Sequence, residues 1–298
     1  GSNDRNCGSF SFSYYIHGML HMNNFQEKNN LPHLLLKSYR GIFPFSIGTT
    51  SYIYPDKILP NVKKLAPYLD EIEILLFESD RESLPDKEEI KQLAAIADNF
   101  SISYNIHLPM DIYLGSEDLS ARNYALDTIK QIVNLTSPLP CSTYTLHIES
   151  FSKNMEKWKY HSFKSMEKLA ASGIKPEKIS VETLLYPFKW IEKIITDFPF
   201  SICMDTGHLM LLQIDPLTFF NKYIDRISII HIHGVENKRD HISLARLEGK
   251  KIETILNILK KFTGIVSIEV FSFDDLDSSL KLLDDCRDIV FFDNPAQL

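Results

Sequence analysis

From Phe45 onward, the sequence alternates between short runs rich in β-branched and aromatic residues and longer segments with helical spacing. The short runs are apolar enough for strands buried on both faces, and each precedes a helical segment, as in a parallel sheet covered by helices. Eight such units in a row favour a closed (β/α)8 barrel over an open sheet. The expected strands are FSIGTTS (45–51), EIEILLFE (71–78), SISYNIHLP (101–109), TYTLHI (143–148), ISVETL (179–184), FSICMDTG (200–207), RISIIHIHG (226–234) and IVSIEVFS (265–272).

The domain organisation follows from the same alternation. Residues 1–41 are rich in Asn and Ser and show no periodicity, so we expect an irregular N-terminal extension before a single barrel domain at 42–298. A barrel of this kind needs roughly 250 residues. Asp56, Asp86 and Asp215-Pro216 are typical helix starts. Helices are expected at about 57–69, 86–99, 118–136, 160–172, 187–197, 215–224, 250–263 and 274–287.

Composition narrows the class of protein. The chain has 32 Lys and Arg against 39 Asp and Glu, so the net charge of −7 argues against a nucleic-acid partner. The 4 cysteines lie far apart without a CxxC pair, which favours a reducing cytoplasm over a disulfide framework. No apolar run approaches the roughly 20 residues that cross a bilayer, so no membrane partner is expected.

Residue types that bind metal ions recur near the C-terminal ends of six consecutive expected strands. In a barrel these ends converge on the face where active sites form. A single His on a strand is more often structural than a ligand. Buried carboxylates, however, are rare unless paired or bound to metal, and Glu182 and Glu269 interrupt apolar strands. The full set is His107, His147, Glu182, Asp205, His208, His231, His233, His241 and Glu269.

The motif Asp205-Thr206-Gly207-His208, with SVET, HIHG and IEVF, resembles the xylose isomerase-like barrel superfamily, also called AP endonuclease family 2. Its sugar isomerases and epimerases hold one metal through Glu, Asp, His and Glu. Its endonuclease IV-type phosphodiesterases hold further zinc ions. These have an Asp two residues before the last histidine, where this chain has Arg239, with Asp240 adjacent.

A second resemblance covers most of the barrel. IGTTSYIYP, ILPNVKKLAP, IEILLFES, IHLPMDIYLG, SVETLLYPF, DTGHL and HIHG…DHISL are similar to the cobamide-remodelling proteins called CbiR. That family hydrolyses the phosphoester bond in the nucleotide loop of cobamides such as cobalamin and yields cobinamide. The resemblance implies a cobamide substrate.

The resemblances also imply ligand roles. Two or three Zn²⁺ ions are expected, with Mn²⁺ as the alternative, and Glu182, Glu269 and His208 are the expected catalytic residues. His231 shares a face of its strand with His233 and is expected behind the ligands or as a substitute for one. Further candidates for a supporting or substrate-contacting role are Asp240, Glu73, Ser51 and Tyr52. The expected sets are His107, His147 and Glu182; Glu182, Asp205, His233 and Glu269; and His208 with His241.

Two alternatives stay open. The first is a one-metal sugar isomerase or epimerase, in which His107 and His147 would bind no metal. The second is a corrinoid- or sugar-binding barrel without catalysis, whose sequence would lack at least one core ligand. The Glu-Asp-His-Glu set is complete in this chain, which favours an enzyme.

Overall fold

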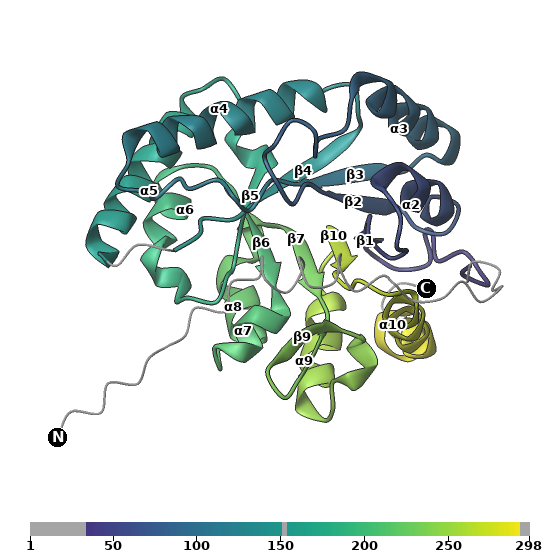
Figure 1. Cartoon of the computed structure of the whole chain (residues 1–298). Coiled ribbons are helices and arrows are strands. Elements are labelled where there is room, and N and C mark those ends of the chain that lie inside the picture. The colour runs from purple at the N-terminus through teal and green to yellow at the C-terminus, as the bar shows by residue number, and fades with distance from the viewer. Residues whose placement is uncertain (1–33, 151–153, 293–298) are drawn as a thin grey trace. The chain divides into compact units, whose positions relative to one another are not determined.

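Eight parallel strands close into a barrel in the computed structural model, which describes residues 34–150 and 154–292 (Figure 1). The expected (β/α)8 fold is therefore confirmed. Neighbours follow the order β1-β10-β7-β6-β5-β4-β3-β2, so the last barrel strand pairs with the first. The strands are β1 (Ser46–Thr50), β2 (Glu71–Leu75), β3 (Ser103–His107), β4 (Cys141–Leu146), β5 (Ile179–Glu182), β6 (Ser201–Asp205), β7 (Ile227–Ile232) and β10 (Ile265–Ile268).

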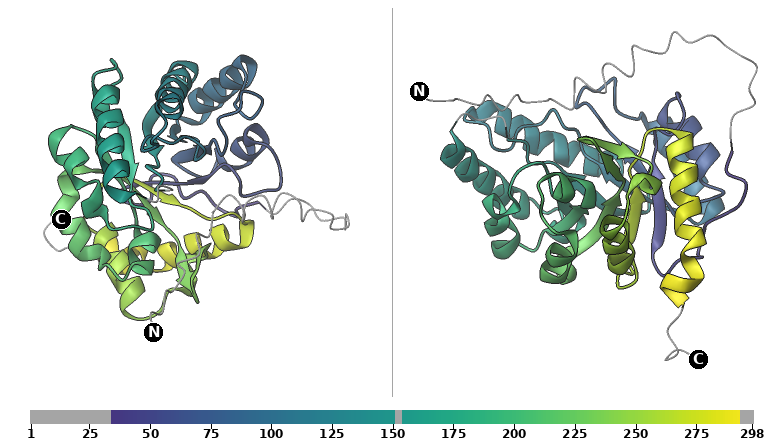
Figure 2. Two further views of the ribbon diagram at one scale, coloured as in Figure 1. Left: turned by 60° about the vertical axis from the view of Figure 1, so that its left-hand side comes forward. Right: turned by 90° about the horizontal axis from the view of Figure 1, so that it is seen from below.

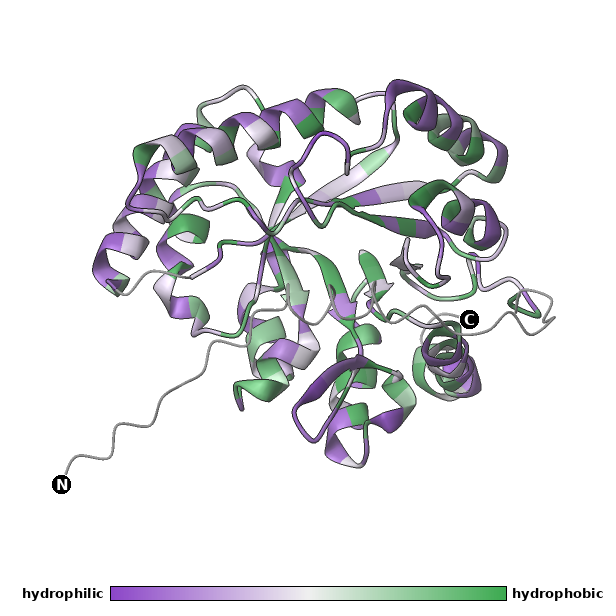
Figure 3. Ribbon diagram, viewed as in Figure 1, coloured by the Kyte–Doolittle hydropathy of each residue, from purple (hydrophilic) through white to green (hydrophobic). Residues whose placement is uncertain are grey.

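Helices follow the strands and lie outside the barrel, and α10 at the end of the barrel lies near β1 at its beginning (Figures 1 and 2). They carry both hydrophobic and hydrophilic faces (Figure 3). Apolar strand residues such as Ile72, Ile106 and Leu146 are fully buried in the core that the helices cover. The helices are α2 (Ile58–Leu65), α3 (Lys87–Phe100), α4 (Leu119–Leu135), α5 (Met155–Ala170), α6 (Glu192–Asp197), α7 (Thr206–Leu211), α8 (Pro216–Tyr223), α9 (Lys250–Leu259) and α10 (Phe273–Asp285).

Two of the three expected helix starts are confirmed. Asp86 forms a capping box with Glu89 at the start of α3, and Asp215 caps α8 immediately before Pro216. The third, Asp56, is wrong: Lys57 is the N-cap of α2, and Asp56 accepts a hydrogen bond from the amide of Lys57 instead. The sequence pattern also missed α7 and a two-stranded hairpin, β8 (Gly234–Glu236) and β9 (Arg239–Ile242).

The barrel interior is polar. Hydrogen bonds between strands that are not neighbours in the sheet must cross this interior. Glu71 on β2 accepts from Ser142 on β4 at 2.9 Å, and Glu73 on β2 accepts from Ser267 on β10 at 2.7 Å. The alternation of side chains along a strand therefore sends polar residues inward and apolar residues toward the helices.

The N-terminal extension is described only from residue 34, so most of the segment predicted to be irregular lies outside the described residues. Within its described end, Leu35 and Tyr39 are buried, and the amide of Tyr39 donates to the carbonyl of Tyr68 at 2.8 Å. Among the helices that the structure describes, none combines the length and apolarity needed to cross a bilayer.

Glu71 gives the fold a testable pH dependence. Burial raises the pKa of this carboxyl from 4.5 to about 7, so the folded state binds a proton that the unfolded state releases. The contribution of Glu71 to stability is then largest below pH 4.5 and decreases by about 3 kcal/mol as the pH rises to about 7. Glu71→Gln should remove this loss of stability. The free energy of unfolding of the variant should therefore rise relative to that of the wild type between pH 4.5 and about 7.

Urea unfolding of both proteins at several pH values measures the difference. The exposed Glu248 supplies the matched control, Glu248→Gln, which should keep the wild-type slope. Parallel profiles for Glu71→Gln and the wild type would contradict the assignment.

Candidate metal centre

Glu182 lies at the C-terminal end of β5 and is only 1% exposed. Its Oε2 lies 2.9 Å from Nε2 of His147, just beyond β4, and 3.5 Å from Nε2 of His107 at the end of β3. Donor atoms of these three residues all lie within 4.8 Å of one another. The structure thus brings together the first ligand set in the combination that the family resemblance implied.

The two imidazoles of this set are held by their other nitrogens. Nδ1 of His107 lies 3.0 Å from the carbonyl oxygen of Leu108, and Nδ1 of His147 lies 3.0 Å from Glu149 Oε1. A ring that donates through Nδ1 leaves the lone pair of Nε2 available for a metal. Both Nε2 atoms face the carboxylate of Glu182.

The second ligand set contains Glu182, Asp205, His231 and Glu269. The sequence placed His233 here, and the structure places His231 instead. Strand register explains the difference, because His231 lies beside Asp205 in the pairing of β7 with β6, whereas His233 follows the end of β7. Nδ1 of His231 lies 3.0 Å from Glu269 Oε2 and 3.9 Å from Glu182 Oε1.

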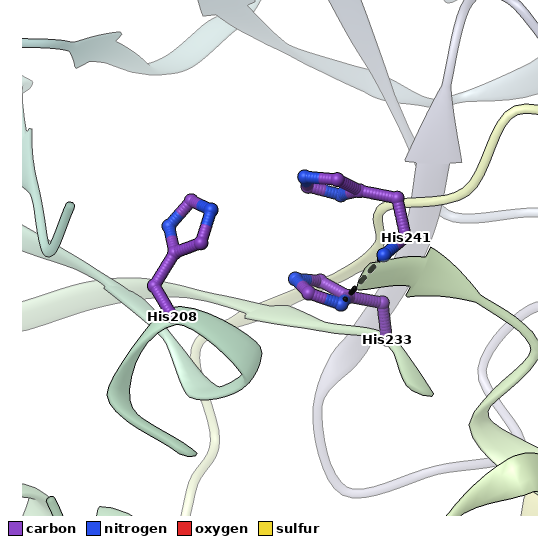
Figure 4. A group of neighbouring side chains, drawn as sticks. All are labelled: His208, His233 and His241. Carbon is purple, nitrogen blue, oxygen red and sulfur yellow. Dashed lines mark hydrogen bonds between the residues drawn. The ribbon is translucent and has the colours of Figure 1, made fainter. Parts of the chain in front are cut away.

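The third ligand set consists of His208, His233 and His241 (Figure 4). Asp205 caps α7 by accepting from the amide of His208 at 2.7 Å, which fixes the histidine in the first turn of this helix. The hairpin carries His241, whose ring centroid lies 4.2 Å from that of His233. Asp240, the other candidate here, belongs to none of the ligand sets among the described residues.

Gly207 accounts for the glycine in the DTGH motif. A Cβ atom at this position would lie 2.0 Å from Cε1 of His233, so only glycine allows the ring to pack against α7. Gly234 meets a similar restriction, since its Cβ would lie 2.1 Å from the carbonyl oxygen of Ser243 on the returning chain. Gly207 allows the ring of His233 to approach α7, and Gly234 allows the returning strand of the hairpin to approach β8. Both contacts help to position the histidines of the third set.

Opposite charges dominate the electrostatics of the centre. Burial raises the pKa of Glu182, but the facing imidazoles outweigh it and hold this pKa well below its usual range. Burial lowers the pKa of His147, yet Glu182 and Glu149 raise it to about 10. In the same way, Asp205 overcomes burial and raises the pKa of His233 to about 9. The carboxylates thus favour positive charge on the rings that they face.

Several buried atoms of the centre have no hydrogen bond among the described residues. They include both ring nitrogens of His231 and Oε2 of Glu269, although the two side chains lie close together. Four buried carboxylates lie around the imidazole of His231: Glu73, Glu182, Asp205 and Glu269. Buried charges of this kind are normally paired or bound to metal. The donor set therefore fits divalent cations.

Glu73 supports the second set from below. It is 1% exposed, and its Oε1 lies 3.1 Å from Nε2 of His231, on the opposite side of the ring from Glu269. Its other oxygen accepts from Ser267. The expected supporting position of Glu73 is consistent with this geometry.

Ser51 and Tyr52 lie immediately after β1. The buried hydroxyl oxygen of Ser51 accepts a hydrogen bond from the amide of Leu75 at 3.1 Å, which ties β1 to β2. The half-buried ring of Tyr52 lies 4.7 Å from that of Phe77. Burial, followed by the charge of Glu78, raises the pKa of Tyr52. These contacts hold both residues beside β2 and the segment after it, and a role in substrate binding stays a prediction.

Two residues of the centre, Glu149 and Cys203, were not among those predicted from the sequence. Glu149 orients His147, and its position two residues beyond that histidine was the available signal. Cys203 is fully buried, and its sulfur lies within 4.8 Å of donor atoms of Glu182 and His231. Its position two residues before Asp205 on β6 was a signal, because alternate residues share a face.

A parallel eight-stranded barrel with clustered histidines and carboxylates beyond its strand ends defines a class of metal-site TIM barrels. Residues 63–286, more than half of the chain, match the family described as xylose isomerase-like TIM barrel. The chain belongs to this family.

Three comparisons illustrate the similarity. The chain aligns with a D-tagatose 3-epimerase-like protein at a TM-score of 0.70 and 20% identity, covering 83% of this chain and 98% of that one. An endonuclease IV from Thermus thermophilus aligns at 0.58 and 15% identity, covering 80% and 98%. A local match to inosose dehydratase of Lacticaseibacillus casei is 49% identical over 49 residues, 14% of this chain and 16% of that protein. Both structural alignments support the fold alone.

Gly207→Ala tests the packing of the third set. The added Cβ would displace the ring of His233, so we expect at least a tenfold loss of affinity for the most weakly bound divalent ion, with the stronger binding steps retained. Isothermal titration with Zn²⁺ and metal analysis measure this change. Met210→Ala on the same helix is the control, and equal titration curves for all three proteins would contradict the prediction.

Proposed function

We propose that the protein is a metal-dependent phosphoester hydrolase. The observation that carries the proposal is the presence of two further ligand sets beside the Glu-Asp-His-Glu set, adjoining it through Glu182 and Asp205. Bound divalent ions would neutralise phosphate oxygens, lower the pKa of water and stabilise the leaving oxygen. A site for one sugar-bound metal has less use for the additional histidines.

Glu182 has the central role in this proposal. Its two oxygens face different sets, with Oε2 toward His147 and Oε1 toward His208 and His231. One carboxylate in this position would hold neighbouring ions at a fixed separation. Glu269, immediately after β10, would complete the second set.

The remaining residues position reactants. His208 and His241 would bind an ion or contact the phosphate from the rim of the barrel. The hydroxyl of Ser51 accepts a hydrogen bond from the amide of Leu75, and Cys203 lies buried beside the second set. Neither is placed as a nucleophile, so water would be the attacking reagent.

The proposed substrate is a cobamide, cleaved at the phosphoester of its nucleotide loop to give cobinamide. The choice of a cobamide rests on the sequence resemblance to the CbiR proteins. The family match extends only to the broader family, and the structural alignments extend only to the fold. The acidic net charge of −7 makes a nucleic-acid substrate less favourable.

A sugar isomerase or epimerase using one metal is the second candidate. The structural comparisons favour it, because the alignment with the epimerase-like protein has a TM-score of 0.70 against 0.58 for the endonuclease. The second set alone would serve that reaction. A non-catalytic corrinoid- or sugar-binding barrel is less well supported, because the Glu-Asp-His-Glu set is complete.

The substrate assay separates these candidates. The protein loaded with Zn²⁺ or Mn²⁺ is incubated with adenosylcobalamin and, separately, with ketohexoses, and products are followed by chromatography and mass. We expect cobinamide and unchanged ketose. Epimerised sugar without cobinamide would move the assignment to the second candidate, and tight corrinoid binding without conversion would favour the non-catalytic protein.

Glu182→Gln tests the bridging assignment. Removing the charge shared by adjacent sets should lower turnover at least a thousandfold, reduce metal content and leave the circular dichroism spectrum unchanged. Glu78→Gln, at an exposed carboxylate after β2, is the matched control and should retain activity. Near-normal turnover of Glu182→Gln would overturn the assignment.

A further inference from the structure

Cys203 lies directly below the second ligand set. It precedes Asp205 by two residues on β6, so both side chains point into the barrel, with the cysteine one step farther from the mouth. The register pairs it with Glu182 on β5. It is fully buried, and its sulfur is one of three donor atoms, with those of Glu182 and His231, that lie within 4.8 Å of one another.

The ring of His231 also points to a cation at this depth. It is fully buried, and its Nδ1 and Nε2 lie 3.0 Å and 3.1 Å from carboxylate oxygens of Glu269 and Glu73. Neither contact has the geometry of a hydrogen bond within the part of the chain that the structure describes. Cys203 and Glu269 lie near this same buried imidazole from different strands. A cation near this ring can take either an oxygen-rich or a sulfur-containing set of ligands.

We propose that Glu182, Cys203 and His231 form an alternative binding site, overlapping the second ligand set, for soft cations such as Cd²⁺. Thiolate ligands select soft ions, whereas carboxylates suit harder ones. The inference rests on the metal assignment of the proposed function, and it holds for either candidate reaction. Binding replaces the thiol proton by the metal, and this proton leaves to solvent.

An ion bound by Glu182, Cys203 and His231 prevents another ion from using all four ligands of the second set. The two sets share Glu182 and His231, so an ion bound to sulfur withdraws two ligands from the ion held by Asp205 and Glu269. Soft cations are therefore expected to inhibit by displacing the ion that supports the reaction. A hard ion, which gains little from sulfur, remains in the oxygen-rich set.

Cadmium titration of matched full-length variants tests the site. The reference protein carries Cys7→Ser, Cys141→Ser and Cys286→Ser and keeps Cys203, and the comparison protein additionally carries Cys203→Ser. We expect the ultraviolet sulfur-to-cadmium charge-transfer band in the reference protein, saturating at one equivalent, and no such band in the comparison protein. Equal absorption in both proteins, or none in either, would overturn the proposal.

Cadmium NMR of the chain with all its cysteines gives a measurement that does not depend on a folded variant. A resonance in the range of mixed sulfur, nitrogen and oxygen ligands supports the site, and a resonance in the oxygen and nitrogen range alone refutes it. Neither readout requires turnover. A sulfur-bound cadmium with no phosphoester hydrolysis would therefore leave this inference standing while the proposed reaction fails.

Discussion

The structure depends on keeping the negative charge of Glu182 inside a barrel that excludes water. An uncompensated buried carboxylate costs several kcal/mol, so it requires positive charge at hydrogen-bonding distance. His107 and His147 approach one oxygen, and His208 and His231 approach the other. These partners come from separate βα units, so the charge can be compensated only when the barrel has closed.

The same constraint explains the unusual filling of the barrel. TIM barrels are commonly packed with branched apolar side chains, but here alternate strand residues form hydrogen bonds across the interior. Glu71 and Glu73 lie on one strand at successive depths, the first bonded to serines and the second beside His231. The metal centre is the uppermost part of a continuous polar interior, which allows ionisable groups to be supported from below.

Much of this arrangement was predictable, because parallel strands leave a strong pattern and convergence at their C-terminal ends follows from topology. The eight strands and the gathering of ligand residues at one end of the barrel were obtained in this way, whereas the grouping of His107, His147 and Glu182 was implied by the family resemblance. The exchange of His231 with His233 was not, since both share one face and only the register with β6 separates their depths. Helix α7 and the hairpin were also not predicted, because each is short and begins directly after a barrel strand. Cys203 was overlooked because a lone cysteine in an apolar strand is most often a small core residue.

The hairpin of β8 and β9 belongs to a sheet separate from the barrel, yet it delivers His241 to the third set. The other two sets stand on residues at or next to the ends of barrel strands and tolerate little change without cost to the fold. A lineage could therefore gain or lose the third set by insertion or deletion in one connection, leaving the eight strands intact. Descendants of a single barrel could in this way diverge in ion number, and with it in reaction, while their architecture stays the same.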